Sequence, residues 1–110
     1  MDKLSLVATA REQSREALAG SQGRAAQTVY GGHDRALRQT VIALSAGSSL
    51  SEHENPGEAT VHVLSGRVRL DGSRTSWEGR SGDLLVVPQE RHSLAALEDS
   101  AVLLTVVKTP

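Results

Sequence analysis

The hydrophobic period of the chain changes near residue 20. In the segment 2–19, apolar residues recur at helical spacing, at Leu4, Val7, Ala10, Ala17 and Leu18. Asp2 or Ser5 is placed to cap this helix, and Gly20 to end it. The apolar stripe is thin, and an isolated helix of this length is marginal in water. We therefore expect the helix to pack against the rest of the protein.

From residue 21 onward the period becomes two, and turn residues recur at the spacing of short strands. The pattern predicts eight strands, at 25–30, 37–44, 60–64, 67–70, 75–78, 84–87, 92–97 and 101–107. The segment 48–57 is polar and is predicted to be a loop. Many short strands separated by glycine turns indicate an all-β sandwich or barrel. We expect one domain, with a helix over 1–20 and a barrel over 21–110.

Two of these strands are apolar on both faces. The segment 84–87 reads Leu-Leu-Val-Val, and 101–107 is nearly as apolar. Such strands need cover on both faces. In a barrel one face looks inward, so the other needs the N-terminal helix or a second subunit. Because 110 residues bury only a modest core, we expect a homodimer.

Composition and charge exclude several classes of function. Hydrophobic residues make up 38% and charged residues 23%, which is typical of a globular protein. The net charge of −1 and the scarcity of aromatic residues, only Trp77 and Tyr30, argue against a nucleic-acid partner. The absence of cysteine excludes disulfides and thiolate chemistry. No apolar run is long enough for a membrane span, and no signal peptide is recognised, so a cytoplasmic protein is expected.

The candidate chemistry lies between Gly47 and Gly66 and near Pro88. His53 and Asn55 alternate along the chain, so they are expected to face the same side, and His92 begins another strand. If that side is the interior, these residues form a polar spot on an apolar wall. Trp77 is expected either to fill the core, which we favour, or to flank a ligand with its indole N–H. The candidate ligand-binding residues are His53, Asn55, His92 and Trp77.

These residues resemble the motifs of the cupin family. The first cupin motif, Gly-x5-His-x-His-x3-Glu-x6-Gly, is matched by Gly47, His53 and Gly66, with Asn55 and Ala59 in place of the second His and the Glu. The second motif, Gly-x5-Pro-x-Gly-x2-His-x3-Asn, is matched by Gly82 and Pro88, with Glu90 in place of the second Gly and His92 one residue early. The resemblance covers about residues 37–107.

The resemblance implies a cupin jelly-roll barrel of about eight short strands, commonly dimeric. In metal-bearing cupins, three His and one Glu hold a divalent ion inside the barrel. Carried over to this chain, only His53 and His92 remain as metal ligands. Asn55 offers a weak neutral oxygen, and Ala59 offers none. Glu58 is expected to point away from the lumen, as is His62, which we place at the surface or at a dimer interface.

Three functional hypotheses follow. The first is a cupin that binds a small molecule in its barrel without catalysis. The second is a metal-dependent enzyme of isomerase or dioxygenase type, with one Mn, Fe, Zn or Ni ion on His53 and His92. The third is a structural protein that acts through its dimer surface. The losses at Asn55 and Ala59 favour the first over the second, and no residue is assigned a catalytic role. With so few rings, the lumen is suited to neither sugars nor aromatic ligands.

Overall fold

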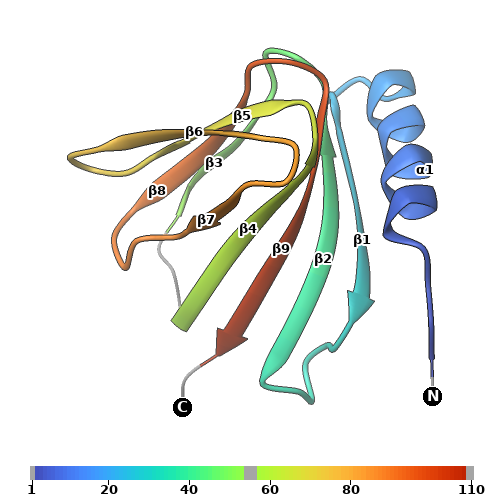
Figure 1. Ribbon diagram of the computed structural model, residues 1–110, viewed down its shortest axis with the longest axis horizontal. Helices are drawn as coiled ribbons and strands as arrows, with labels where there is room; N and C mark the ends of the chain where they lie inside the picture. Colours follow the sequence, from blue (N-terminus) through green and yellow to red (C-terminus); the bar gives the residue numbers. More distant parts are fainter. Residues whose placement is uncertain (1, 54–56, 109–110) are drawn as a thin grey trace.

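The computed structural model describes residues 2–53 and 57–108, with the backbone alone for Glu52 and His53. The described residues form one helix and nine strands, shown in Figure 1: α1 (Leu6–Ala19), β1 (Arg24–Tyr30), β2 (Leu37–Leu44), β3 (Ser49–His53), β4 (Gly57–Ser65), β5 (Arg67–Asp71), β6 (Ser76–Arg80), β7 (Leu84–Val86), β8 (His92–Ala96) and β9 (Ser100–Lys108). The predicted all-β fold with an N-terminal helix is confirmed.

Helix α1 is capped at both ends by local hydrogen bonds. The Ser5 hydroxyl accepts the backbone N–H of Ala8 at 3.1 Å, so of the two candidate caps Ser5 is the one used. At the other end, the N–H of Gly20 donates to the carbonyl of Glu16 at 2.9 Å. The helix therefore starts later than the apolar pattern predicted.

The buried face of α1 differs from the apolar stripe in the sequence. Its buried residues are Thr9, Ala10, Gln13 and Ala17. Val7 and Leu18 are 69% and 62% exposed instead. Gln13 is tolerated inside because its Nε2 donates to Gln27 Oε1 on β1 at 3.2 Å. The helix packs through small and polar side chains, which let it lie close to the sheet.

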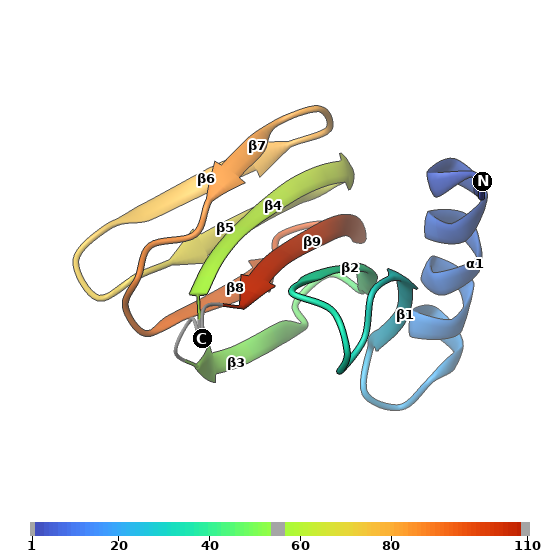
Figure 2. The same cartoon turned by 90° about the horizontal axis from the view of Figure 1, so that it is seen from below.

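The strands form two antiparallel sheets that face each other. One has the order β1-β2-β9-β4-β7, and the other has the order β3-β8-β5-β6. Figure 2 shows the two layers, with α1 on the outer side of the five-stranded sheet. Neighbours such as β2 and β9, or β4 and β9, lie far apart in the sequence. Such crossovers are typical of a jelly roll.

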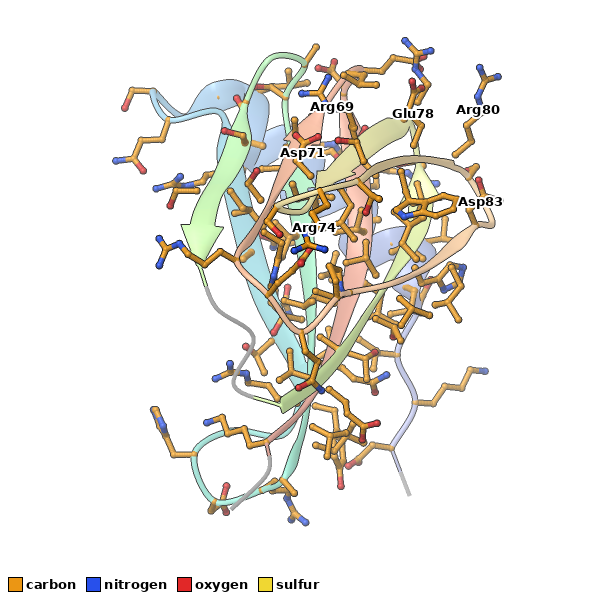
Figure 3. The ribbon with its side chains drawn as sticks, turned by 90° about the vertical axis from the view of Figure 1, so that its left-hand side faces the viewer. Arg69, Asp71, Arg74, Glu78, Arg80 and Asp83 are labelled. Atoms are coloured by element: carbon orange, nitrogen blue, oxygen red, sulfur yellow. The ribbon has the colours of Figure 1, made fainter. Side chains whose placement is uncertain are left out.

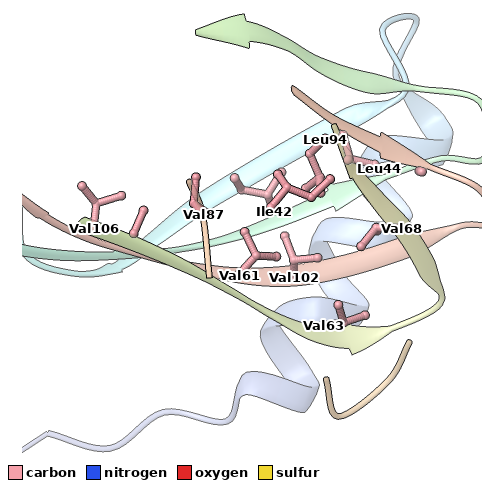
Figure 4. Close-up of a cluster of buried hydrophobic side chains, with 12 residues drawn as sticks. Ile42, Leu44, Val61, Val63, Val68, Val87, Leu94, Val102 and Val106 are labelled. Atoms are coloured by element: carbon pink, nitrogen blue, oxygen red, sulfur yellow. The ribbon is translucent and has the colours of Figure 1, made fainter. Parts of the chain in front are cut away.

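The core lies between the two sheets. Its buried residues, shown in Figure 4, are Ile42, Leu44, Ala59, Val61, Val63, Val68, Leu70, Val87, Leu94, Ala96, Val102 and Val106. A smaller cluster, of Ala10, Val41, Ala101 and Leu103, lies between α1 and the outer face of the five-stranded sheet. The helix thus supplies the second cover that the doubly apolar strand β9 needs.

The main error of the sequence-based prediction is strand β3. The segment 48–57 was predicted to be a loop, but Ser49–His53 pairs with β8. Leu50 is the only apolar residue of that strand, so its period is invisible in the sequence. Its pairing with β8 is a long-range contact that local patterning does not encode. The other strands differ from prediction by at most a few residues at their ends.

Among the described residues, no helix has the length and hydropathy needed to span a bilayer.

Candidate functional site

His92 is the one His whose described side chain lies inside the sandwich. It is the first residue of β8, where His92, Leu94 and Ala96 are buried and alternate with partly exposed residues. Only 7% of His92 is exposed. His92 therefore meets the condition, an inward-facing side chain, under which it was expected to form a polar spot on the apolar wall. That it binds a ligand stays a prediction.

A backbone carbonyl fixes the orientation of the His92 ring. Nδ1 lies 2.8 Å from the carbonyl oxygen of Glu90. Because a carbonyl oxygen can only accept, Nδ1 must carry the hydrogen of this bond. In the neutral ring the lone pair is then on Nε2. The basic nitrogen of the neutral His92 ring is therefore Nε2.

The loop before His92 is held by the side chain of Glu90. Its carboxylate accepts the backbone N–H of Ser73 at 3.1 Å and the Ser73 hydroxyl at 2.8 Å. These bonds hold the pKa of the Glu90 carboxyl below its ordinary value. Glu90 thus ties the loop before β8 to the turn between β5 and β6, and its carbonyl orients His92. In the sequence, the one sign that Glu90 has a structural role was that it stands in place of a motif glycine.

His92 borders a small apolar cavity between the sheets. The cavity has a volume of about 30 Å³, close to the space of one water molecule. The other residues around it are all aliphatic: Ile42, Leu50, Val61, Leu70, Val87, Leu94, Val102 and Leu104. The apolar wall that the sequence predicted is thus aliphatic, and the space that it borders is small. Among the described residues, the site is a tight apolar space with His92 as the one imidazole in its wall.

His53 is brought to His92 by an irregularity in β3. Leu50 pairs with Leu94, and His53 pairs with His92, so β3 has one more residue than β8 between these two pairs. This bulge makes His53, rather than Glu52, the residue opposite His92. The side chain of His53 and the whole of Asn55 lie outside the described part of the chain. Their role in the site stays a prediction.

Trp77 does not occupy the core, so that expectation was wrong. It lies on the edge strand β6, opposite the buried Leu70 of β5, and is 63% exposed. Trp77 is exposed because it lies at the edge of its sheet: the facing sheet ends at the short strand β7 and does not cover the indole. Trp77 is not among the residues around the cavity. A ligand contact by Trp77 would therefore have to be made at the sandwich edge.

The remaining His residues follow the expected parity. On β4, Val61 and Val63 are buried, whereas His62 is half-buried on the opposite face, opposite Leu84 of β7 and Leu103 of β9. His33 is exposed between β1 and β2. Neither residue borders the cavity.

Solved structures with the same architecture identify the fold. A conserved protein of unknown function from Streptococcus pyogenes is 29% identical, with 83% of this chain and 79% of that chain covered and a TM-score of 0.73. A cupin superfamily protein from Desulfitobacterium hafniense is 20% identical, with 78% of each chain covered and a TM-score of 0.72. The protein has the fold of a small cupin.

Further comparisons agree on the fold and do not specify a function. An RmlC-like cupin protein from Desulfovibrio desulfuricans is 24% identical, with 76% of this chain and 81% of that chain covered and a TM-score of 0.67. No protein-family model matches the sequence, and no curated protein is significantly similar to it. Function must therefore be argued from the site.

The glycines that match the family motifs have a physical reason to be glycine. Gly47, Gly66 and Gly82 have φ values of +86°, +83° and +92°. This is the left-handed region, which other residues adopt only at a cost. At Gly66 a side chain would also collide with the carbonyl of Asp99. The motif spacing thus reflects the turns of the barrel, and it is informative about fold rather than chemistry.

The metal-binding part of the cupin motif fares differently. Ala59 stands where the motif has its carboxylate and is buried in the core, while the adjacent Glu58 is exposed on the other face. Among the described residues, no three His, Cys, Asp or Glu side chains come together as metal ligands. Metal centres usually need three or four protein ligands. The described donors therefore do not fit a metal, and binding through His53 and His92 stays a prediction.

Proposed function

We propose that this cupin binds a short aliphatic molecule with one hydroxyl or carboxyl group, held inside the barrel by His92. The observation that carries the proposal is the composition of the cavity wall: eight aliphatic side chains and one oriented imidazole. An apolar site with a few placed polar groups is typical of small-molecule binding. The proposed role is binding, with no residue assigned to a chemical step.

His92, the one polar side chain among the described residues of the wall, sets the chemistry of the ligand. His92 Nε2 accepts a hydrogen bond when the ring is neutral, which suits an alcohol or a protonated acid. When the ring is protonated, the same position suits a carboxylate. Among the described residues, a second polar group on the ligand would meet only aliphatic side chains, and burying it there costs free energy. Sugars, with many hydroxyls, are therefore expected to be rejected.

The size of the cavity means that its wall must yield on binding. A volume of about 30 Å³ holds one water molecule, so a ligand of several carbons needs side chains to move. Ile42 and Leu50 border both the cavity and an open hollow of about 300 Å³ beside β1. Leu50 is only partly buried and lies on the edge strand β3. We expect the ligand to enter from this hollow past Leu50.

The test is NMR observation of the His92 ring during titration with isobutanol, isobutyrate and glucose. Isobutanol or isobutyrate is expected to shift the Nε2 resonance of His92, with weak affinity because so few atoms are in contact. Glucose is expected to cause no shift. The proposal fails if neither aliphatic probe perturbs His92 at any concentration at which the protein stays folded.

Two variants separate binding from folding. His92→Gln keeps a polar side chain at this position, and His92→Leu replaces it with an apolar one. Both new side chains are close in volume to that of His. Isobutanol is expected to protect the wild type and, more weakly, H92Q against thermal unfolding, and to have no effect on H92L. Equal protection of wild type and H92L would show that the alcohol binds elsewhere.

The metal hypothesis is tested on the same samples. His53 and His92 are backbone neighbours across β3 and β8, and a carbonyl that orients an imidazole is the usual support of a metal-binding His. Titration with Zn²⁺, Ni²⁺ and Mn²⁺ into wild type and His53→Ala distinguishes the two functions. Stoichiometric metal binding that needs His53, with no response to the aliphatic probes, would favour the metal site over the proposed one.

A further inference from the structure

Helix α1 leaves an open groove between itself and the end of β4. The helix packs on β1 and β2 and touches β9, and β4 is the next strand of the sheet beyond β9 (Figure 2). The groove has a volume of about 260 Å³. Its apolar wall consists of Leu6, Val7 and Ala10 on α1 and Leu64 on β4. We call this space the helix groove. It lies on the outer face of the sheet, so it is separate from the cavity beside His92, which lies between the sheets.

Three polar side chains complete the wall of the helix groove: Arg11, Ser14 and Ser65. Arg11 lies four residues after Val7, and Ser14 lies three residues after Arg11, so these side chains share one face of the helix. α1 and β4 run in the same direction, upward in Figure 1, and Ser65 follows Leu64 at the end of β4. The polar side chains therefore gather toward one end of the groove, and the apolar side chains toward the other.

The polar side chains of the groove are available to a ligand. Within the described part of the chain, neither the Arg11 guanidinium nor the hydroxyls of Ser14 and Ser65 have a hydrogen-bond or ion-pair partner. On β5, in the other sheet, the arrangement is different: Arg69 Nε lies 2.8 Å from Asp71 Oδ1, and the two side chains are neighbours in Figure 3. A cation with no carboxylate beside it, at the end of an apolar wall, complements a ligand that carries one negative charge on an apolar body.

We propose that the helix groove binds a straight-chain fatty acid, with its alkyl chain over Val7 and Leu64 and its carboxylate at Arg11. A guanidinium can donate two parallel hydrogen bonds to the two oxygens of one carboxylate. The hydroxyls of Ser14 and Ser65 are placed to donate to the same oxygens. The proposal does not depend on what the barrel binds, because the two sites share no residue.

The size and charge of the groove define the acid more closely. A volume of about 260 Å³ corresponds to about nine water molecules of about 30 Å³ each. Because a methylene group is close in size to a water molecule, an alkyl chain of about eight carbon atoms fills the groove. The single charge of Arg11 balances the single charge of a carboxylate, whereas a phosphate monoester carries nearly two negative charges. A medium-chain fatty acid therefore fits better than a phosphate ester.

The test is NMR titration of the isotope-labelled full-length protein with octanoate, below the concentration at which octanoate forms micelles. Saturable shifts are expected at Val7, Arg11 and Leu64, with a dissociation constant of about 1 mM because few atoms are in contact. The ring of His92 is expected to keep its resonances. Shifts at His92 without shifts at the groove residues would place the acid in the barrel and overturn the proposal.

Two further probes separate the contributions of the chain and the carboxylate. Octylammonium has the same chain with the opposite charge, and acetate has the carboxylate without the chain. Neither is expected to shift the groove residues at concentrations at which octanoate saturates them. If octylammonium binds as tightly as octanoate, Arg11 does not select the charge, and the proposal fails. If acetate binds as tightly, the apolar wall has no part in binding, and the proposal fails as well.

Matched variants on the same helix locate the site. Arg11→Gln is expected to weaken octanoate binding about tenfold, because it removes a charge-assisted hydrogen bond. Arg15→Gln is the control, because Arg15 lies one turn further along α1 and does not border the groove. Its dissociation constant is expected to stay within about twofold of the wild type, since exposed charges are screened by solvent and salt. Equal effects of R11Q and R15Q would refute a carboxylate site at Arg11.

The apolar wall is tested in the same way. Val7 and Leu18 are 69% and 62% exposed on α1, and only Val7 borders the groove. Val7→Ser is expected to weaken octanoate binding about threefold and Leu18→Ser to leave it unchanged, with equal melting temperatures because both side chains are exposed. The mass of each protein is measured by sedimentation. Absence of octanoate binding, together with a lower mass for V7S than for the wild type, would show that a second copy of the chain covers the groove and would overturn the proposal.

Discussion

Filling the cavity beside His92 is the sharpest test of the site. Val102 is 1% exposed and borders the cavity, so Val102→Ile adds one methylene group next to an empty space. Burial of a methylene stabilises by about 0.8 kcal/mol. Removal of a void of about 30 Å³, at about 24 cal/mol per Å³, gives about 0.7 kcal/mol. The two values agree, and they correspond to a rise in melting temperature of about 4 °C.

The matched control is Val63→Ile. Val63 lies on β4 opposite Val102 and is also fully buried. It is not among the residues around the cavity. It already packs tightly, since a Cβ at Gly79 would lie 3.1 Å from Val63 Cγ2. An extra methylene there has no space to enter, and it is expected to destabilise the protein by about 1–3 kcal/mol.

The assay is urea unfolding of wild type, V102I and V63I, followed by isobutanol titration of each. V102I is expected to be more stable than wild type and to have lost alcohol binding, because the same space serves both. A V102I protein that is destabilised as much as V63I would mean that the cavity does not exist in solution. A stabilised V102I that binds isobutanol like the wild type would place the ligand elsewhere and refute the proposed site.

Three further predictions concern the scaffold. Gly66→Ala forces a side chain into the left-handed region and against the carbonyl of Asp99, so the free energy of unfolding is expected to fall by at least about 2 kcal/mol, measured by urea unfolding. Ser5→Ala removes the helix cap and is expected to cost about 1 kcal/mol, visible as a lower melting temperature. The bonds from Ser73 lower the folded-state pKa of Glu90, so the stability that they supply is present above the ordinary value of 4.5 and is lost as the pH falls through the lower folded value. In Glu90→Gln the free energy of unfolding is therefore expected to fall less steeply between about pH 7 and about pH 3 than in the wild type. An equal slope in the two proteins would show that Glu90 does not supply this pH-dependent stability.

Much of the fold could be predicted from the chain because its elements carry their own signals. The strand Leu37–Leu44 was predicted to the residue, since its second half is apolar and it ends at a turn. The parity of β4 was also predictable: alternation alone places Val61 inside and His62 outside. The turns at the motif glycines were predictable too, because a backbone with positive φ favours glycine and a glycine is visible in the sequence.

The site was only partly predictable. The sequence predicted that His92 begins a strand, and an inward-facing His92 was one of the two faces open to it. Its orientation by the carbonyl of Glu90, and the pairing with His53 across a bulge, did not. Both depend on which strand lies beside β8, and the polar segment of β3 carries no period that would reveal it. Trp77 was misplaced for a related reason: a large aromatic residue predicts burial, but burial depends on what the facing sheet covers.

The sequence by itself determined the helix, most strands and the faces of those strands, because these follow from spacing along the chain and from turn residues. Only the tertiary structure decided that the described residues form nine strands in two sheets, that the cavity beside His92 is small, and that β6 and β7 end the sheets with Trp77, Leu84 and Val86 exposed. Cavities and uncovered edges arise where elements distant in sequence meet or fail to meet. Their volumes and exposures are sums over many side chains, so no local pattern encodes them.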